Sequence, residues 1–343
     1  VEQALLVWDD GVESNAYVVD NTNSSSRFRF VGEAKINGDW SAGYLLEIEA
    51  INTASSAVDQ NLDDDNGTTP AINIRQSHWW LKSKQLGKIA VGRNSTATDD
   101  IILSDTAGAG PAAWANVNEV GGGFFLRRKN GDLLGGTSLS EFAPTLDTSR
   151  RDVIRYDSPT FMDWKVVAAW GEDDFWDVGL WGAGKIGDQF TYSAGIGYLN
   201  NTCVPADGTS AAATACEAIS GETEYNEWKG SASLLHNPTG LFLYGAFVHR
   251  EYEDATRADL DYYYLRPGIV VKGLLPVGKS VFFGEWWRGE DGLVGTGEAG
   301  LSQVDGTVTA SEVEGFGLGV TQHVEAAAME IYAMYRQFDT EVE

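Results

Sequence analysis

Residues 190–198 of this 343-residue chain read FTYSAGIGY, and every second side chain in the run is apolar. The apolar set begins and ends with an aromatic ring, at Phe190 and Tyr198, and the residues between its members are threonine, serine or glycine. Successive side chains of a β-strand point to opposite faces, so this period of two predicts a strand with one apolar face. The same alternation recurs in residues 27–36 and 40–51, which indicates an all-β fold.

The composition narrows the classes of protein to which the chain can belong. A formal net charge of −26 argues against a nucleic-acid partner, because phosphate backbones are bound by clustered lysine and arginine. The 40 glycines would weaken helices but suit twisted strands and turns. No apolar run approaches the roughly 20 residues of a membrane-spanning helix, whereas a strand of a membrane barrel needs only about 10 alternating residues.

The connections between the predicted strands alternate between short turns and long polar loops. Two of the short ones are residues 37–39 and 186–188. The long ones cover residues 9–26, 52–71, 96–150, 201–224 and 292–310. Short turns at one end of the strands and long loops at the other are typical of an outer-membrane β-barrel.

Aromatic residues mark the ends of the apolar strand faces. Trp164 and Trp170 bracket Val166 and Ala168, and strand geometry places the two indoles ~14 Å apart along a membrane normal. This separation fits an apolar band between two aromatic girdles. The residues that we assign to the girdles are Trp164, Trp170, Phe190 and Tyr198.

Charges in mid-strand favour a barrel over a soluble β-sandwich, whose strands also alternate. Arg29, Glu47 and Arg155 lie on the polar strand faces, and they could not pack in a sandwich core without partners. A secreted sandwich that binds glycans through Trp286 and Trp287 is the alternative, and it would stay soluble without detergent.

The pattern predicts fifteen strands in a single domain that spans residues 1–343. They cover residues 3–9, 27–36, 40–51, 72–83, 88–95, 151–157, 164–171, 175–185, 190–200, 225–236, 241–252, 261–274, 279–291, 311–323 and 327–339. A bacterial barrel made from one chain has an even number of strands. We therefore expect sixteen, with the last one C-terminal to Glu343; the alternative is that one strand has been split or merged.

Three segments resemble the general porins of Gram-negative bacteria, and most of all the variety common in alphaproteobacteria. They are NSSSRFRFVGEAKINGDWSAGYLLEIE (23–49), RQSHWWLKSKQLGKIAVGR (75–93) and IRYDSPTFMDWKVVAAWGEDD (154–174). The similarity runs over essentially the whole chain. The family ends in a strand that closes with an aromatic residue, which this sequence lacks.

The resemblance implies an outer-membrane, multi-pass homotrimer with one pore per subunit, in contact with lipid and lipopolysaccharide. It also implies that the long third loop, residues 96–150, folds inward and narrows the pore. NEVGGG (118–123) resembles the acidic, glycine-rich part of that loop in the family, which makes Glu119 a constriction residue. The first five strands would form the trimer interface, where His78, Trp79 and Trp80 break the clean alternation.

Charged residues near this loop are the candidates for selectivity, because a wide lumen selects only where charge acts at short range. The basic candidates on the lumen wall are Arg29, Arg75, Arg93, Arg151 and Arg155. The acidic candidates in the loop are Asp99, Asp100, Asp105 and Glu119. Opposed rows of charge would orient dipolar solutes. Alternatively, or in addition, the arginines would pair with loop carboxylates and simply pin the loop to the wall. The net acidity favours a mild preference for cations.

Cys203 and Cys216 lie in one polar loop, and their spacing predicts a disulfide formed in an oxidising compartment, with two free thiols as the alternative. We expect no cofactor. An acidic loop such as Asp63 to Asp65 could hold Ca²⁺ through its oxygens, but it lacks EF-hand spacing and a solvated loop is favoured.

The four histidines lie outside any nucleophile motif such as GxSxG, so we do not expect an enzyme. The sequence therefore predicts a porin through which small hydrophilic solutes and ions diffuse passively, with a solute-specific barrel as the alternative.

Overall fold

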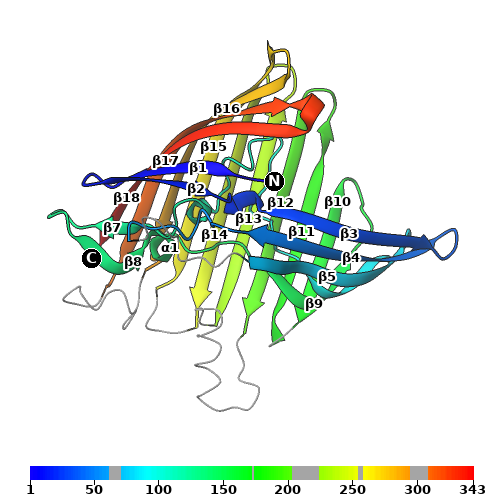
Figure 1. Cartoon of the computed structure of the whole chain (residues 1–343). Coiled ribbons are helices and arrows are strands. Elements are labelled where there is room, and N and C mark those ends of the chain that lie inside the picture. The colour runs from blue at the N-terminus through cyan, green and yellow to red at the C-terminus, as the bar shows by residue number, and fades with distance from the viewer. Residues whose placement is uncertain (62–70, 172–173, 203–223, 254–257, 294–307) are drawn as a thin grey trace.

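The protein is described by a computed structural model, in which residues 1–61, 71–171, 174–202, 224–253, 258–293 and 308–343 are placed. Fourteen strands of this part of the chain form one antiparallel sheet in which each strand pairs with its neighbours in sequence order (Figure 1). They are β3 (Ser26–Lys35), β4 (Trp40–Ile51), β5 (Ala71–Ser83), β6 (Gly87–Ser95), β9 (Arg150–Asp157), β10 (Trp164–Gly171), β11 (Trp176–Ile186), β12 (Phe190–Asn201), β13 (Tyr225–His236), β14 (Leu241–Tyr252), β15 (Leu260–Leu275), β16 (Gly278–Glu290), β17 (Ser311–Val324) and β18 (Met329–Val342).

These strands match fourteen of the fifteen predicted ranges to within a few residues. The exception is the first range, 3–9, which the pattern assigns to the barrel wall. It forms β1 (Ala4–Asp9) and pairs with β2 (Ser14–Val19), a strand inside the segment predicted as a loop. The side chain of Asp10 accepts hydrogen bonds from the amides of Val12 and Glu13 and so closes a tight turn between the two. Because the large sheet has fourteen strands among the described residues, the total of sixteen stays a prediction.

The two faces of the large sheet differ in what covers them. On one face the apolar side chains have no protein cover: Ile196, Leu243 and Leu265 are all at least 40% exposed. On the other face their neighbours Tyr244 and Tyr264 are buried. A continuous apolar surface of this kind requires a nonaqueous environment, and lipid supplies it for a barrel strand. None of the described helices is long and apolar enough to cross a membrane.

The loop between β6 and β9, residues 96–149 and hereafter the inner loop, lies against the covered face of the sheet (Figure 1). It contains η2 (Val117–Glu119), β7 (Phe125–Arg127), β8 (Leu133–Ser138) and α1 (Leu139–Phe142). Its Ile101, Ile102 and Phe142 are buried in one cluster with Tyr262 and Trp287 of the wall. The prediction that this loop folds into the barrel is confirmed.

The small residues of FTYSAGIGY make room for this loop. A Cβ atom on Gly195 would lie 2.6 Å from Ile101, and one on Gly197 would lie 2.5 Å from the Thr98 methyl group. The same strand therefore has its small face toward the inner loop and its aromatic and apolar face on the opposite, uncovered side of the sheet.

The hairpin β1–β2 packs on the inner loop and on β18. The indole of Trp8 stacks on Phe124 with ring centroids 4.3 Å apart, and it lies 6.1 Å from Phe338. Beyond the hairpin, the amide of Asn21 donates to the Tyr332 hydroxyl at 2.6 Å. Two short 3₁₀ turns complete the described elements, η1 (Thr22–Ser24) and η5 (Glu325–Ala327).

The aromatic residues assigned to the girdles occur in rows on neighbouring strands. Tyr198 contacts Trp176 and Trp228, with centroid distances of 5.4 and 4.9 Å, and Trp176 is in register with Trp170. At the opposite ends of these strands Trp164 lies 6.2 Å from Tyr192, and Phe190 lies 5.0 Å from His236. Their contact with a membrane interface stays a prediction. Cys203, Cys216 and the acidic residues 63–65 lie outside the described residues.

Candidate pore constriction

A cavity of about 170 Å³ lies between the inner loop and the wall formed by β4, β5 and the residues just before β3. Six of its lining side chains are ionisable: Glu49, Arg75, Asp100, Glu119, Asp147 and Arg150. Uncharged residues that complete the lining are Thr22, Asn23, Ser25, Ile51, Leu103, Trp114 and Asn116. Of the nine candidates from the sequence, Arg75, Asp100 and Glu119 line this cavity.

Arg75 is the centre of the basic wall. Its Nε donates to Glu47 at 3.0 Å, and its Nη1 donates to Glu49 at 2.6 Å. Both glutamates come from β4, where they are buried on the inner face. Arg29 reaches the second oxygen of Glu47 at 2.6 Å while half of its side chain stays exposed. The wall is therefore an ordered network in which buried carboxylates hold guanidinium groups at the lumen surface.

Arg150 and Asp147 line the same cavity, and the sequence pattern predicts neither of them. Arg150 begins β9, and its Nη2 lies 3.6 Å from Asp99 and 3.8 Å from Asp100. By the alternation of side chains along β9, Arg150 would point away from the lumen, on the same side of the strand as Ile154. The preceding residue, Ser149, has a φ of 68°. This turns the chain, so the alternation of side chains does not hold at Arg150. Two adjacent arginines at the boundary of the long loop were the available signal.

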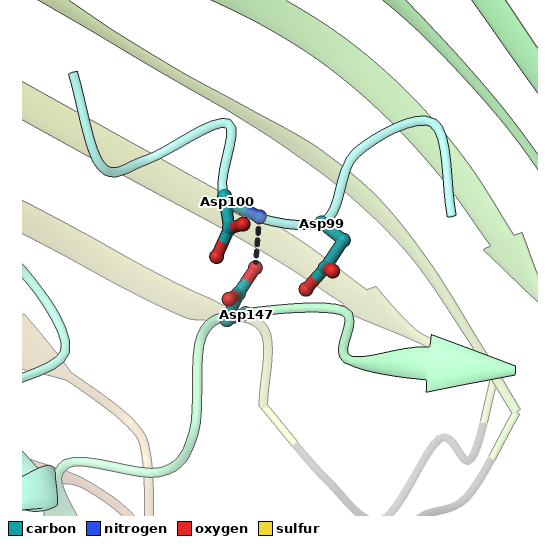
Figure 2. A group of neighbouring side chains, drawn as sticks. All are labelled: Asp99, Asp100 and Asp147. Carbon is teal, nitrogen blue, oxygen red and sulfur yellow. Dashed lines mark hydrogen bonds between the residues drawn. The ribbon is translucent and has the colours of Figure 1, made fainter. Parts of the chain in front are cut away.

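The acidic side comes from both ends of the inner loop. Asp99 and Asp100 follow β6, and Asp147 precedes β9; the three carboxylates converge (Figure 2). Asp147 Oδ1 accepts a hydrogen bond of 2.8 Å from the amide of Asp100. The first end is held by Asp177 of β11, whose carboxylate accepts from the amide of Thr98 at 2.7 Å.

The acidic groups raise one another's pKa values in this confined space. Burial, followed by the charge of Asp147, raises the pKa of Asp99 well above its usual value and that of Asp100 to about 6. The same two causes raise the pKa of Glu119 to about 7. The arginines Arg150 and Arg75 act in the opposite direction on Glu119. The charge of the loop side therefore changes with pH near neutrality.

The remaining candidates lie away from the cavity. Arg93 is exposed and is in register with the exposed Asp152. It donates to the carbonyl of Ile74 at 3.2 Å. Because Arg93 lies on the same face of β6 as the outward-pointing Ile89, its assignment to the lumen wall was wrong. The guanidinium of Arg151 lies over the ring of Phe175, 4.5 Å from the centroid.

Arg155 and Asp105 instead shape the loop. Arg155 donates to the carbonyls of Ser95 and Thr96, both at 2.9 Å, and so holds the start of the inner loop through backbone oxygens rather than through loop carboxylates. Asp105 accepts hydrogen bonds from loop amides, including Ala109 at 2.8 Å, and forms an ion pair of 3.1 Å with Arg266.

Basic residues on β13 to β18 fix the rest of the inner loop by donating to its carbonyl oxygens. Lys229 donates to Leu146 at 3.0 Å, Arg250 to Thr145 at 3.1 Å, and Arg336 to Val117 at 3.0 Å. Arg266 donates to the carbonyl of Ala113, and Lys279 donates to Ala107 at 2.6 Å. These residues form what we call the clamp, and the sequence pattern does not indicate their role.

Comparison with known proteins agrees with the fold. A model of the family described as Gram-negative porin matches residues 4–342. The chain is similar in structure to an anion-selective porin from Comamonas acidovorans, with a TM-score of 0.57 and 14% identity over 99% of this chain and 90% of that one. It is also similar to OmpT, an outer membrane protein of Vibrio cholerae solved in a trimer form, with a TM-score of 0.56 and 13% identity over 98% and 86% of the two chains. A search of curated proteins finds no match.

Proposed function

This chain belongs to the Gram-negative porin family and is an outer-membrane channel for passive diffusion, and we propose that its selectivity is set where Arg75 and Arg150 face Asp100, Glu119 and Asp147. The observation that carries the proposal is the 170 Å³ cavity between these two sets of side chains. In such a narrow space ions pass within a few ångströms of fixed charges, which is the condition for selection.

The arrangement of charge supports a transverse field. The cavity lining combines Arg75 of the wall with loop carboxylates such as Asp100, while the guanidinium group of Arg150 lies beside Asp100, at 3.8 Å. A field of this orientation aligns dipolar solutes and passes ions in hydrated form, while an apolar solute gains nothing from it. Small hydrophilic molecules are therefore the proposed substrates, and transport involves no chemical step.

The sign of the selectivity follows from the balance of charge. Four carboxylates and two guanidinium groups line the cavity, and Glu49 is paired directly with Arg75. When Asp100, Glu119 and Asp147 are ionised, they outnumber the remaining Arg150. This balance supports a preference for cations above neutral pH, in the direction of the overall net charge of −26.

We also propose that the protein assembles as a homotrimer through the outer faces of β3 to β5. Phe28, Phe30, Tyr44 and Trp79 are more than half exposed there, and a structural relative is described in a trimer form. Mass determination by analytical ultracentrifugation in detergent tests this assembly: a threefold mass supports it, and a single-chain mass contradicts it.

The experiment for the channel is conductance in a planar bilayer, with the reversal potential measured under a KCl gradient at pH 8 in the presence of a calcium chelator. We expect ohmic steps and a reversal potential of the sign that indicates potassium preference. Stable insertion without conductance would contradict an open channel, and a chloride preference would contradict the charge balance given above.

A further inference from the structure

We propose that lysines on the inner face of the sheet, at the end of the strands with the short turns, bind the phosphate group of a small anionic solute. Eight of the ten lysines in the chain lie within four residues of a short turn between two strands. They are Lys35, Lys82, Lys84, Lys88, Lys165, Lys185, Lys272 and Lys279. In a chain with a net charge of −26, positive charge is thus concentrated at one end of the sheet.

Strand register places three of these lysines in one row across neighbouring strands, which we call the lysine row. Lys35 of β3 is paired with Ser41 of β4, and Ser41 is paired with Lys82 of β5. Lys82 is paired with Lys88 of β6, and Lys88 is paired with Asp157 of β9. Residues directly opposite each other in an antiparallel sheet have their side chains on the same face, so these five side chains are neighbours.

The lysine row lies on the face of the wall that carries the constriction. Ser41 and Glu47 are six residues apart on β4, and an even separation puts two side chains on the same face of a strand. Glu47 holds Arg75 at 3.0 Å, so the row and the basic wall line the same lumen. At about 3.3 Å per residue, the row is roughly 20 Å from Glu47 along the strand.

Lys82 and Lys88 are like charges held directly opposite each other. The Cβ atoms of such a pair are about 4.5–5.5 Å apart, and like charges at this separation destabilise the sheet. An anion between the two ammonium groups would replace this repulsion by two attractions. The pair is therefore the first observation that indicates a ligand.

The second observation is that the carboxylate of the row is already occupied by an arginine. Arg155 donates to both oxygens of Asp157, from Nε at 3.1 Å and from Nη2 at 2.9 Å, which is a bidentate pair. Lys88 and Lys165 lie farther from the same carboxylate, at 3.6 and 3.4 Å. One carboxylate thus faces three cations, and the local excess is two positive charges before Lys82 is counted.

This excess of positive charge is accessible to solutes. The side chains of Lys88 and Lys165 are 33% and 39% exposed, and Lys82 is exposed as well. Lys35 has Glu33 two residues away on the same face of β3, so the excess is centred on the other three lysines. Each ammonium group can donate three hydrogen bonds, which leaves donors for a ligand.

The donor set identifies the class of ligand. A phosphate group on a small molecule carries about −1.5 to −2 charges near neutral pH and has three strong acceptor oxygens. Its charge matches the local excess, and its oxygens can accept from several ammonium groups at once. Chloride and a single carboxylate carry one charge and would gain less. The ligand is therefore a phosphate group, either free or attached to a small solute.

The site adds a function to the one proposed for the constriction. Charges separated by more than about 10 Å are largely screened at 0.1 M salt, and the row is roughly twice as far from Arg75. The lysine row would therefore concentrate phosphorylated solutes at one end of the lumen. The preference between potassium and chloride would still be set at the constriction.

The test is calorimetry on the full chain folded in detergent, at pH 8 and low salt. The probes are inorganic phosphate, glucose 6-phosphate and glucose, so that recognition of the phosphate group is separated from recognition of the sugar. The variants are Lys82→Gln and Lys88→Gln. The matched control is Lys272→Gln, which removes the same charge from an exposed position near another short turn, on β15. Circular dichroism and thermal unfolding verify that each variant is folded.

We expect the wild type and Lys272→Gln to bind both phosphate compounds saturably and glucose not at all. The interaction of two charges about 4 Å apart in water corresponds to about a fivefold change in affinity. Folded Lys82→Gln and Lys88→Gln should therefore bind at least fivefold more weakly. Binding of inorganic phosphate alone would support a site for the free anion.

Three results would overturn the proposal. They are no saturable binding of either phosphate compound by the wild type, equal affinity in all four proteins, and a weakening in Lys272→Gln as large as that in the two row variants. The last result would show that only the overall charge matters. Calorimetry needs no current, so the outcome is independent of the conductance experiment that tests the channel.

Discussion

Basic side chains occur on both halves of the inner wall, but the two halves use them differently. On β13 to β18 the clamp residues Lys229, Arg250 and Arg266 are at most 2% exposed and bind carbonyls of the inner loop. On β3 and β5, Arg29 and Arg75 keep contact with the lumen and are held by glutamates of the wall. A charge on the lumen face therefore affects solutes only where the inner loop leaves it uncovered.

The largest expected effect concerns the clamp. Arg250→Met removes the 2.6 Å ion pair with Glu227 and the bond to Thr145, and the loss of one partner from a buried pair costs about 3–5 kcal/mol. Arg29→Met removes a half-exposed partner of Glu47, for which about 1 kcal/mol or less is expected. Urea unfolding in lipid vesicles measures both. Equal destabilisation by the two variants would remove the distinction between the two halves of the wall.

For ion selectivity, substitutions of the lumen-exposed arginines should have a larger effect than substitutions in the clamp. Arg75→Gln removes a charge from the cavity lining. The interaction of a fixed charge with an ion about 4 Å away in water is worth about 1 kcal/mol, which corresponds to roughly a fivefold change in the potassium-to-chloride permeability ratio. We expect that ratio to rise in Arg75→Gln, as read from the reversal potential. Arg266→Lys, which keeps a clamp charge beneath the loop, should leave the ratio within experimental error, and an equal rise there would contradict the comparison.

A smaller effect is expected from pH. The pKa of Glu119 is raised from 4.5 to about 7, so this side chain is largely ionised at pH 8 and largely protonated at pH 6. Potassium preference should therefore fall as the pH is lowered through 7, and Glu119→Gln should flatten that part of the profile. Asp100, with a pKa of about 6, leaves a residual slope below pH 6.5. A wild-type profile that is flat between pH 8 and 6 would contradict the assignment.

The smallest effect is expected at Arg93, which the sequence placed on the lumen wall and the structure does not. Arg93→Gln removes a charge from the outer face of β6, where the side chain donates to the carbonyl of Ile74. Its conductance and reversal potential should equal those of the wild type. A shift as large as that of Arg75→Gln would restore Arg93 to the constriction.

Strand pattern predicts the wall of this molecule well, because alternation is imposed residue by residue by the two environments of a barrel strand. FTYSAGIGY is an example, since both its apolar and its small face match their surroundings. Pattern fails where the backbone leaves the sheet. The turn at Ser149 redirects Arg150, and the hairpin β1–β2 arises from an acidic turn inside a segment expected to be a loop.

The site is less predictable than the fold, because its residues meet only through the path of the inner loop. Asp99 and Asp147 are far apart in sequence and adjacent in space (Figure 2). No local sequence pattern shows that these two residues are neighbours in space. The clamp residues cannot be predicted from sequence either, because they bind backbone carbonyl oxygens, which every residue has. Arg75, Asp100 and Glu119 could be named because charge near a long loop is a broad criterion.

The most direct test of the central claim is the reversal potential of Asp147→Asn beside that of Asp132→Asn, in a KCl gradient at pH 8 with chelator present. Both variants remove one negative charge from the inner loop, but Asp147 lines the cavity whereas Asp132 lies at an exposed position between β7 and β8. We expect a shift toward chloride of about fivefold in the permeability ratio for Asp147→Asn and none for Asp132→Asn. Equal shifts, or no shift in either variant, would contradict the claim that selectivity is set at this constriction.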